Sequence, residues 1–355
     1  MISRRALLLA GVSALALPMV RPALAQTRTD FRVAWSIYVG WMPWGYAADS
    51  GIVQKWADKY GLTIEVTQFN DYVESINQYT AGAYDAVTVT NMDALSIPSA
   101  GGVDTTAVIV GDFSAGNDAV FLKGAGTLAD IADRRVNLVE FSVSHYLLAR
   151  GLDTVGLSEA DVTVVNTADP DMVGAFQTPD VTAMVTWNPM VAEIEGLPDA
   201  VKVFDSSQIP GEIIDLMVAS TASLAENPDF GKALAGIWYE TAALMVSDTA
   251  EGAAARAAMG AASGTDQAGF ESQLAATRLF DKPAEAVAFT TSPDLKATMD
   301  LVRGFLFDKG LLGTGAPSAD IIGIELPGAV VLGDPANIKL RFSAEYMQMA
   351  ADGAL

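Results

Sequence analysis

The side-chain types on which most catalytic sites depend are almost missing from this sequence. The chain has no cysteine, which excludes disulfides and thiolate chemistry, and His145 is its one histidine. A serine–histidine–aspartate triad or a histidine-based metal site would therefore have to use that single residue. We expect no enzymatic activity, no metal and no cofactor.

Carboxylates and aromatic side chains gather instead in the segments that follow predicted strands. The acidic residues of these segments are Asp93, Asp112, Asp118 and Glu140, and no basic residue occurs between Lys59 and Lys123. A carboxylate accepts paired hydrogen bonds from a guanidinium, and an aromatic face stabilises a cation by roughly 0.5 to 2 kcal/mol. An anion beside a buried carboxylate is unfavourable by several kcal/mol unless the carboxylate is protonated. The residues favour a cation such as guanidine, or a neutral urea-like amide.

Twelve residues of these segments are predicted to bind the ligand. They are Tyr38, Trp41, Trp44, Asn91, Asp93, Asp112, Asn117, Glu140, Ser142, His145, Trp187 and Asn188. Structural roles compete at several of these positions. Trp41 and Trp44 can pack beneath the first helix, and His145 can be an ordinary helix residue. Glu140 can cap the helix that follows it, and Asp112 can belong to a hinge turn. The amide side chains fit a ligand but are also common in loops.

Strands and helices alternate twice along the chain. The first unit has strands at 31–35, 62–69 and 85–90 and helices at 43–60, 71–81 and 94–100; the second has strands at 135–140, 162–166 and 182–187 and helices at 143–151 and 172–176. Beyond Asn227 the sequence is rich in alanine and predicts mainly helices. This order is typical of parallel sheets covered by helices on both faces. Ligands of such sheets bind where the strands end at their carboxyl side.

The first 25 residues are predicted to be an export signal. Arg4 and Arg5 precede a short apolar stretch, and Ala23-Leu24-Ala25 is a small-residue cleavage pattern. The two arginines resemble a twin-arginine signal, with an ordinary secretory signal as the alternative. The mature chain would begin at Gln26 in the periplasm. Its length suggests two domains.

The chain is strongly acidic. Its formal net charge is −22 at neutral pH, and loss of the three arginines of the predicted signal would bring it to about −25. Such a surface repels nucleic acid and anionic lipid, so neither is expected as a partner. The charge is also explained by solubility alone.

Several stretches, in order, resemble the type II periplasmic solute-binding proteins of the nitrate, sulfonate and taurine importers. They are VGWMPWGYAADSGI at 39–52, AGAYDA at 81–86, DFSAGNDA at 112–119, VEFSVSHYLL at 139–148 and AMVTWNP at 183–189. The stretches at 140–148 and 186–189, with GDPANIKLRF at 333–342, further resemble binding proteins found with urea carboxylase systems. This narrower likeness implies a small nitrogen compound such as urea or guanidine as cargo.

The resemblance implies an α/β fold of two lobes with a helical C-terminal part. One lobe is expected to comprise residues 26–113 and 217–355, the other residues 114–216, with hinges at Ser114–Asn117 and Ile214–Met217. The implied function is that of a monomeric binding protein serving the membrane permease and ATPase of an ABC importer. An anion or sulfonate binder of the same fold and a sensor subunit stay open as alternatives. An enzyme on this fold would need the reactive residues that the chain lacks.

Overall fold

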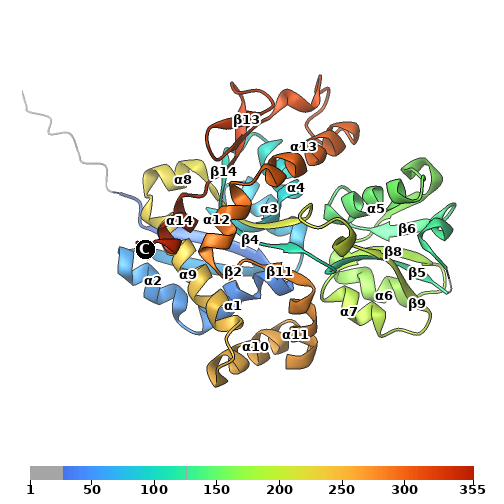
Figure 1. The fold of residues 1–355 in the computed structure, drawn as a ribbon, viewed down its shortest axis with the longest axis horizontal. Coiled ribbons are helices and arrows are strands. Elements are labelled where there is room, and N and C mark those ends of the chain that lie inside the picture. The colour runs from blue at the N-terminus through green and yellow to red at the C-terminus, as the bar shows by residue number, and fades with distance from the viewer. Residues whose placement is uncertain (1–26, 125) are drawn as a thin grey trace, which may run out of the picture.

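The computed structural model describes residues 27–124 and 126–355, which form two unequal lobes lying side by side (Figure 1). Each lobe is a sheet covered by helices, so the predicted two-lobed α/β fold is confirmed. No helix in the described residues is long and apolar enough to span a membrane. The predicted export signal, its twin-arginine feature and the mature start at Gln26 lie outside the described residues.

The larger lobe contains a nine-stranded sheet with the strand order β13-β12-β14-β4-β10-β3-β1-β2, and β11 pairs with β4. Its strands are β1 (Asp30–Ser36), β2 (Thr63–Phe69), β3 (Ala86–Thr90), β4 (Thr105–Ser114), β10 (Ile214–Ser220), β11 (Thr277–Leu279), β12 (Gly323–Leu326), β13 (Val330–Leu332) and β14 (Ile338–Phe342). Strands β1, β2 and β3 are parallel, whereas β10 runs antiparallel between β3 and β4.

The smaller lobe contains a five-stranded sheet of order β7-β6-β8-β5-β9. Its strands are β5 (Asp118–Lys123), β6 (Arg135–Leu138), β7 (Thr163–Asn166), β8 (Ala183–Trp187) and β9 (Ala200–Asp205). β6 is parallel to β7 and β8, and β5 is antiparallel to β8 and β9. The central strands β5 and β8 are almost entirely buried apolar residues, as expected for strands covered on both faces.

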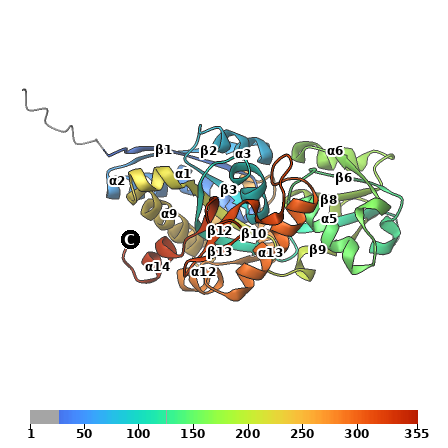
Figure 2. The ribbon, with the colours of Figure 1, turned by 90° about the horizontal axis from the view of Figure 1, so that it is seen from above.

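Most helices belong to the larger lobe. These are α1 (Met42–Asp49), α2 (Ile52–Tyr60), α3 (Tyr72–Thr80), α4 (Asn91–Ala94), α8 (Thr221–Glu226), α9 (Asp229–Met245), α10 (Ala250–Ala262), α11 (Gln267–Ala275), α12 (Pro283–Thr290), α13 (Pro293–Asp308) and α14 (Glu345–Ala351). The smaller lobe has α5 (Val143–Thr154), α6 (Met172–Gln177) and α7 (Met190–Glu195). Seen from above, α13 reaches from the larger lobe toward α5 of the smaller one (Figure 2).

The helix predicted at 43–60 is two helices in the structure. Gly51 adopts a left-handed backbone conformation with φ of 82° and separates α1 from α2. A left-handed residue cannot continue a right-handed helix, and glycine adopts this conformation at little cost. The predicted start near Pro43 and the end before Gly61 agree with the observed helices.

The chain crosses between the lobes twice within the described residues. The first crossing segment, residues 115–117, joins β4 to β5, and the second, residues 206–213, joins β9 to β10. Strand β10 belongs to the larger sheet from Ile214 onward. The predicted boundary of the larger lobe, residue 217, therefore lies within this strand. The larger lobe is therefore discontinuous in sequence, with its two parts adjacent in the sheet.

Candidate functional site

A cavity lined by residues of both lobes lies between them, at the level of the crossing segments. The larger lobe and the second crossing segment contribute Tyr38, Trp41, Tyr72, Thr90, Ile213 and Asp215, and the smaller lobe contributes Asp118, Val143 and Trp187. No lysine, arginine or histidine is among these lining residues of the described chain. The cavity therefore presents two carboxyl groups and four aromatic rings.

The sheet topology brings these residues to one place. Thr90 and Trp187 are the last residues of β3 and β8, so they lie at carboxyl ends of strands. Asp118 and Asp215 lie near the starts of β5 and β10, which run antiparallel to those strands. Asp118 is directly opposite Trp187, and Asp215 is directly opposite Thr90. The starts of the antiparallel strands thus meet the ends of their neighbours at the edges that face the other lobe.

Asp215, which lines the cavity, is paired with a second carboxyl group that does not line it. Asp112 of β4 is directly opposite Asp215 of β10, so two buried carboxyl groups face each other. The Tyr38 hydroxyl donates to Asp112 Oδ1 at 3.5 Å, while Asp112 Oδ2 has no hydrogen-bond partner among the described residues. Asp112 is 0% exposed, and Asp215 is 3% exposed.

Burial governs the protonation of these acids. Desolvation raises the pKa of Asp118 to about 7, with a smaller contribution in the same direction from the charge of Asp93. Desolvation also raises the pKa values of Asp112 and Asp215. The negative charges of Asp112 and Asp118 raise the pKa of Asp215 further. No arginine or lysine in the described residues forms a salt bridge with these three carboxyl groups. The site is therefore a buried acidic cluster without a counter-ion from the described chain.

Asp93 supports the aromatic wall without lining the cavity. Its Oδ2 accepts hydrogen bonds from the Tyr72 hydroxyl at 2.7 Å and from Thr90 Oγ1 at 2.9 Å. Burial raises the pKa of Asp93 to about 6, although the hydrogen bonds from Tyr72, Thr90 and the Val143 backbone oppose the shift. Asp93 therefore fixes the positions of Tyr72 and Thr90.

Four aromatic rings form a row along the cavity. The ring centroids are 5.2 Å apart for Tyr38 and Trp41, 5.5 Å for Trp41 and Tyr72, and 5.7 Å for Tyr72 and Trp187. The last pair crosses between the lobes. Such tilted and edge-on contacts hold the rings in place and leave faces available to a ligand.

Two of the predicted ligand residues have structural roles in the larger lobe. Trp44 stacks on Trp238 at 6.1 Å between the ring centroids, in the packing beneath α1 and α9. Asn91 donates to the Glu212 carbonyl oxygen and accepts from the Ile214 backbone, which ties α4 to the second crossing segment. Neither residue lines the cavity.

Two further predicted amides bind each other near the first crossing segment. Asn188 Nδ2 donates to Asn117 Oδ1 at 2.8 Å, and Asn117 Nδ2 donates to the Ala276 carbonyl and the Thr277 hydroxyl. Because these donors are used within the protein, the pair links the smaller lobe to β11 rather than lining the cavity.

The predicted group at the start of α5 also lies outside the cavity. Ser142 caps the helix through its hydroxyl, and Glu140 is half-buried beside a separate depression that Phe141 also lines. His145 Nδ1 accepts from the Phe141 backbone at 3.1 Å, and its Nε2 is 3.0 Å from Glu159 Oε2. Both ring nitrogens are thus engaged by the protein.

Several residues that line the cavity were not predicted from the sequence. Asp118 was noted in its segment but was not among the twelve predicted residues, and Tyr72, Thr90 and Asp215 were missed. Asp215 begins a strand, so a rule that looks only at the carboxyl ends of strands overlooks it. The usable signal was a single carboxylate inside an otherwise apolar run, Ile-Ile-Asp-Leu-Met-Val.

Gly40 is adjacent to the site, and a side chain there is expected to disturb it. A Cβ atom would lie 2.4 Å from Asp112 Oδ2 and 2.7 Å from Tyr38 Cε1. We expect Gly40→Ala to destabilise the protein by about 1–3 kcal/mol, the usual cost of overpacking. Gly174→Ala is the control, because that position has open space and a helical alanine is favourable. Denaturant unfolding measures both; equal stability of the two variants would contradict the close packing at Gly40.

Two α/β lobes joined by two crossing segments, with a cavity between them, define the periplasmic-binding-protein fold. Residues 34–261 match the NMT1-like family, and the chain belongs to that family. Binding proteins of Brucella abortus and Brucella melitensis are 25% identical over 186 residues, which is 52% of this chain. The match spans 57% of the length of these relatives, a little more than half.

Solved structures share the fold at low sequence identity. The alkanesulfonate-binding protein of Xanthomonas axonopodis pv. citri, bound to MOPS, has a TM-score of 0.66 at 17% identity, covering 81% of this chain and 96% of that protein. The periplasmic aliphatic sulphonate-binding protein of Escherichia coli has a TM-score of 0.62 at 19% identity, covering 80% and 94%. The nitrate-binding protein of Synechocystis PCC 6803 has a TM-score of 0.56 at 12% identity, covering 92% and 99%.

These relatives are described as binding proteins, in agreement with the expectation that the chain is not an enzyme. In the described residues, no group of three or more histidine, cysteine, aspartate and glutamate side chains is arranged to hold a metal ion. Asp112, Asp118 and Asp215 are therefore not arranged as a set of metal ligands.

Proposed function

We propose that this chain is the extracytoplasmic solute-binding protein of an ABC importer and that its cargo is a small nitrogen-rich cation, with guanidinium favoured over urea. The observation that carries the proposal is the cavity between the lobes, in which aromatic rings and carboxyl groups face a ligand without any basic residue. Its partners would be a membrane permease and ATPase, and it would act as a monomer in the periplasm.

Electrostatics distinguishes the proposed cargo from the anions of the structural relatives. Two like charges 4 Å apart repel by about 4 kcal/mol at an effective dielectric constant of 20. A nitrate or sulfonate beside Asp118 and Asp215 would face this repulsion unless both acids were protonated. A cation instead supplies the counter-charge that the cavity of the described chain lacks. The names of the solved relatives make an anion the second candidate.

The geometry of guanidinium suits the positions of the two acids. Its planar edges each donate two parallel hydrogen bonds to a carboxylate. Asp215 lies on the larger lobe and Asp118 on the smaller one, so one ligand can be bound from both sides. The flat faces can stack against Trp41, Tyr72 or Trp187. A quaternary ammonium has no N–H groups and would leave both carboxylates without hydrogen bonds.

Capture follows from contacts made by both lobes. The described structure is closed around the cavity, since Tyr72 contacts Trp187 and donates its backbone N–H to Asp169 of the smaller lobe. A ligand shifts an open protein toward this form only through its greater affinity for the closed one. A bound cation supplies that difference by bridging Asp118 and Asp215.

Ligand screening tests the cargo directly. Guanidinium chloride at millimolar concentrations should raise the melting temperature more than urea, and nitrate or taurine should have little effect. Isothermal titration calorimetry then gives the affinities. Strong binding of nitrate or taurine without a response to guanidinium or urea would overturn the cargo and leave a binding protein for anions.

Removing a ring from the cavity should weaken binding. Trp187→Ala is expected to reduce guanidinium affinity by roughly 0.5 to 2 kcal/mol, because one stacking surface and the contact with Tyr72 are lost. The control is Phe141→Ala, which removes an exposed ring of the same lobe outside the cavity. Calorimetry should show no change for the control. Equal affinities for both variants would contradict a ligand-binding role of Trp187.

A further inference from the structure

The smaller lobe contributes one ionisable group to the cavity in the described chain, the carboxyl group of Asp118. Its other two contributions are Val143 and Trp187. Asp118 is the first residue of β5, immediately after the first crossing segment, and it is 3% exposed. Any charge-dependent attraction between a ligand and this lobe must therefore act mainly through Asp118.

The backbone at Asp118 is fixed to both crossing segments. Its N–H faces Ser114 Oγ at 3.2 Å and Ser206 Oγ at 3.4 Å, and these two hydroxyls are 2.6 Å apart. The N–H of Gly116 donates to Ser206 Oγ at 2.8 Å. The start of β5, and with it Asp118, is thus held against both crossing segments.

Asp118 faces the acids of the larger lobe across the cavity. Its charge acts on Asp112 and Asp215, and in both cases it disfavours their ionisation. Closing an empty, ionised site therefore brings like charges together. A cation between Asp118 and Asp215 converts this repulsion into attraction from both lobes.

We propose that Asp118 makes lobe closure depend on a positively charged ligand, opposing closure of the empty site and driving closure of the occupied one. This inference rests on the proposed cationic cargo. Asp118 would then be a specificity-determining residue, because a neutral urea of similar shape binds the same rings without the electrostatic gain. Selectivity would arise from the charge in the smaller lobe as well as from the shape of the cavity.

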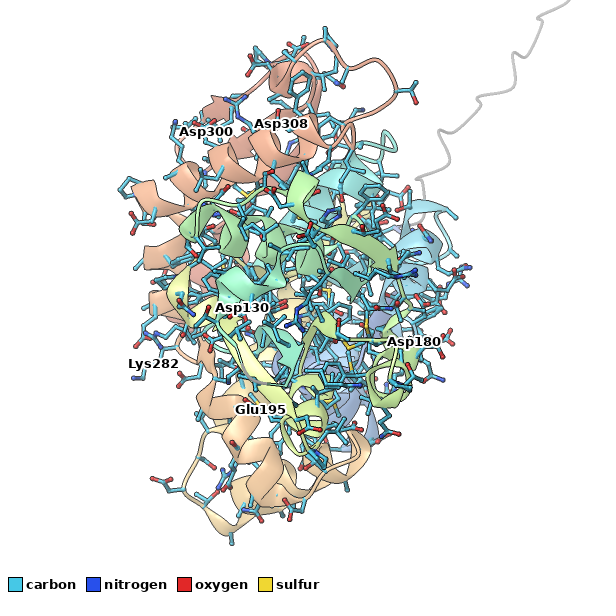
Figure 3. The ribbon with its side chains drawn as sticks, turned by 90° about the vertical axis from the view of Figure 1, so that its right-hand side faces the viewer. Asp130, Asp180, Glu195, Lys282, Asp300 and Asp308 are labelled. Carbon is cyan, nitrogen blue, oxygen red and sulfur yellow. The ribbon has the colours of Figure 1, made fainter. Side chains whose placement is uncertain are left out.

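The test uses Asp118→Asn, which keeps the size of the side chain and removes its charge, and Asp118→Glu, which keeps the charge. Asp180→Asn is the control, because Asp180 is an exposed acid of the same lobe and projects from its surface (Figure 3). The chain has no cysteine, so Glu65→Cys and Glu195→Cys give one labelling site on each lobe for distance measurements by fluorescence.

We expect three results with the labelled proteins at neutral pH. Empty Asp118→Asn should be more closed than the empty unsubstituted protein. Its affinity for guanidinium chloride should fall about tenfold or more, while its affinity for urea should change little, so the ratio of the two affinities falls. Asp118→Glu and Asp180→Asn should keep a ratio that favours guanidinium.

Two outcomes overturn the inference separately from the proposed function. If the unsubstituted protein binds guanidinium and Asp118→Asn keeps both the same selectivity and the same empty-state distance, Asp118 does not control closure. If the unsubstituted protein binds only anions, the proposed cargo and this inference both fail. Circular dichroism and the melting temperature show whether Asp118→Asn is folded. If it is not folded, the affinity ratio and the lobe distance are measured with Asp118→Glu instead.

Discussion

Replacing Asp215 by asparagine should abolish most of the affinity for guanidinium and stabilise the empty protein. The variant loses a charged acceptor that lines the cavity, and a hydrogen bond to a charged group is worth about 1.5–3 kcal/mol. This corresponds to a loss of affinity of about ten- to a hundredfold. The same change relieves the repulsion between Asp215 and Asp112, which face each other without a salt-bridge partner in the described residues. At pH 8 the empty variant should therefore melt at a higher temperature.

Two matched variants serve as controls for this prediction. Asp112→Asn leaves the cavity-lining carboxylate in place and provides an amide donor to it, so its loss of affinity should be smaller. Asp180→Asn should behave as the unsubstituted protein, because Asp180 is an exposed acid far from the cavity lining. Calorimetry and thermal melting measure the two effects. If Asp215→Asn has a lower melting temperature and an unchanged affinity for guanidinium, the carboxyl group stabilises the fold and does not bind the ligand.

The fold could be predicted from the sequence because local patterns and topology agree. The alternation of apolar strands and amphipathic helices in residues 31–100 corresponds to β1 through the π-helix Leu95–Ser99 that follows α4. The prediction joined α1 and α2 because the apolar spacing continues across Gly51, and the spacing alone does not show that this glycine has positive φ. The strands β4, β5, β9 and β10 were not predicted, and neither were the short strands β11 to β14.

The candidate site was only partly accessible from the sequence. The segment containing Tyr38 and Trp41 and the end of β8 at Trp187 line the cavity, and the deficit of basic residues in the surrounding segments is a property of the cavity itself. These residues follow parallel strands, where the rule for strand ends applies. The amides and His145 were indistinguishable from ligand residues by type, and only the structure shows which protein groups use their hydrogen bonds.

Asp215 and Tyr72 illustrate what the sequence leaves open. Asp215 reaches the cavity because β10 inserts antiparallel between β3 and β4, a pairing between segments far apart in the chain. Tyr72 begins α3, and its neighbour Asp71 caps that helix by accepting a hydrogen bond from the Glu74 backbone. Its place beside Trp187 depends on the contact between the lobes, which no local pattern encodes.

The affinity for the cargo should increase with pH, and this dependence separates a cation from an anion. In the empty site, burial raises the pKa of Asp118 to about 7 and raises the pKa values of Asp112 and Asp215; Tyr38 faces Asp112 and Asp215, and Asp93 faces Asp118. Raised carboxyl pKa values mean that the folded empty protein binds more protons than the unfolded chain. Their contribution to stability is therefore complete below the unfolded value near 4 and is lost as the pH rises through about 7.

A bound cation favours the ionised acids and expels these protons. Guanidinium itself stays charged over the whole range, since its pKa is above about 12. Each proton released makes the affinity rise about tenfold per pH unit until the acids are ionised. We expect guanidinium binding to strengthen by about ten- to a hundredfold between pH 5 and 7 and then to level off. Titrations in buffers of different ionisation enthalpy count the released protons.

An anionic cargo would show the opposite slope. Nitrate and sulfonates keep their negative charge over this range, so their binding would require protonated acids and would weaken as the pH rises. The variants Asp118→Asn and Asp215→Asn should each flatten the dependence, because each removes one of the titrating groups. An affinity for guanidinium that is constant from pH 5 to 8 would mean that the acids of the cavity do not exchange protons for the cargo. Binding that weakens with pH would favour the anion.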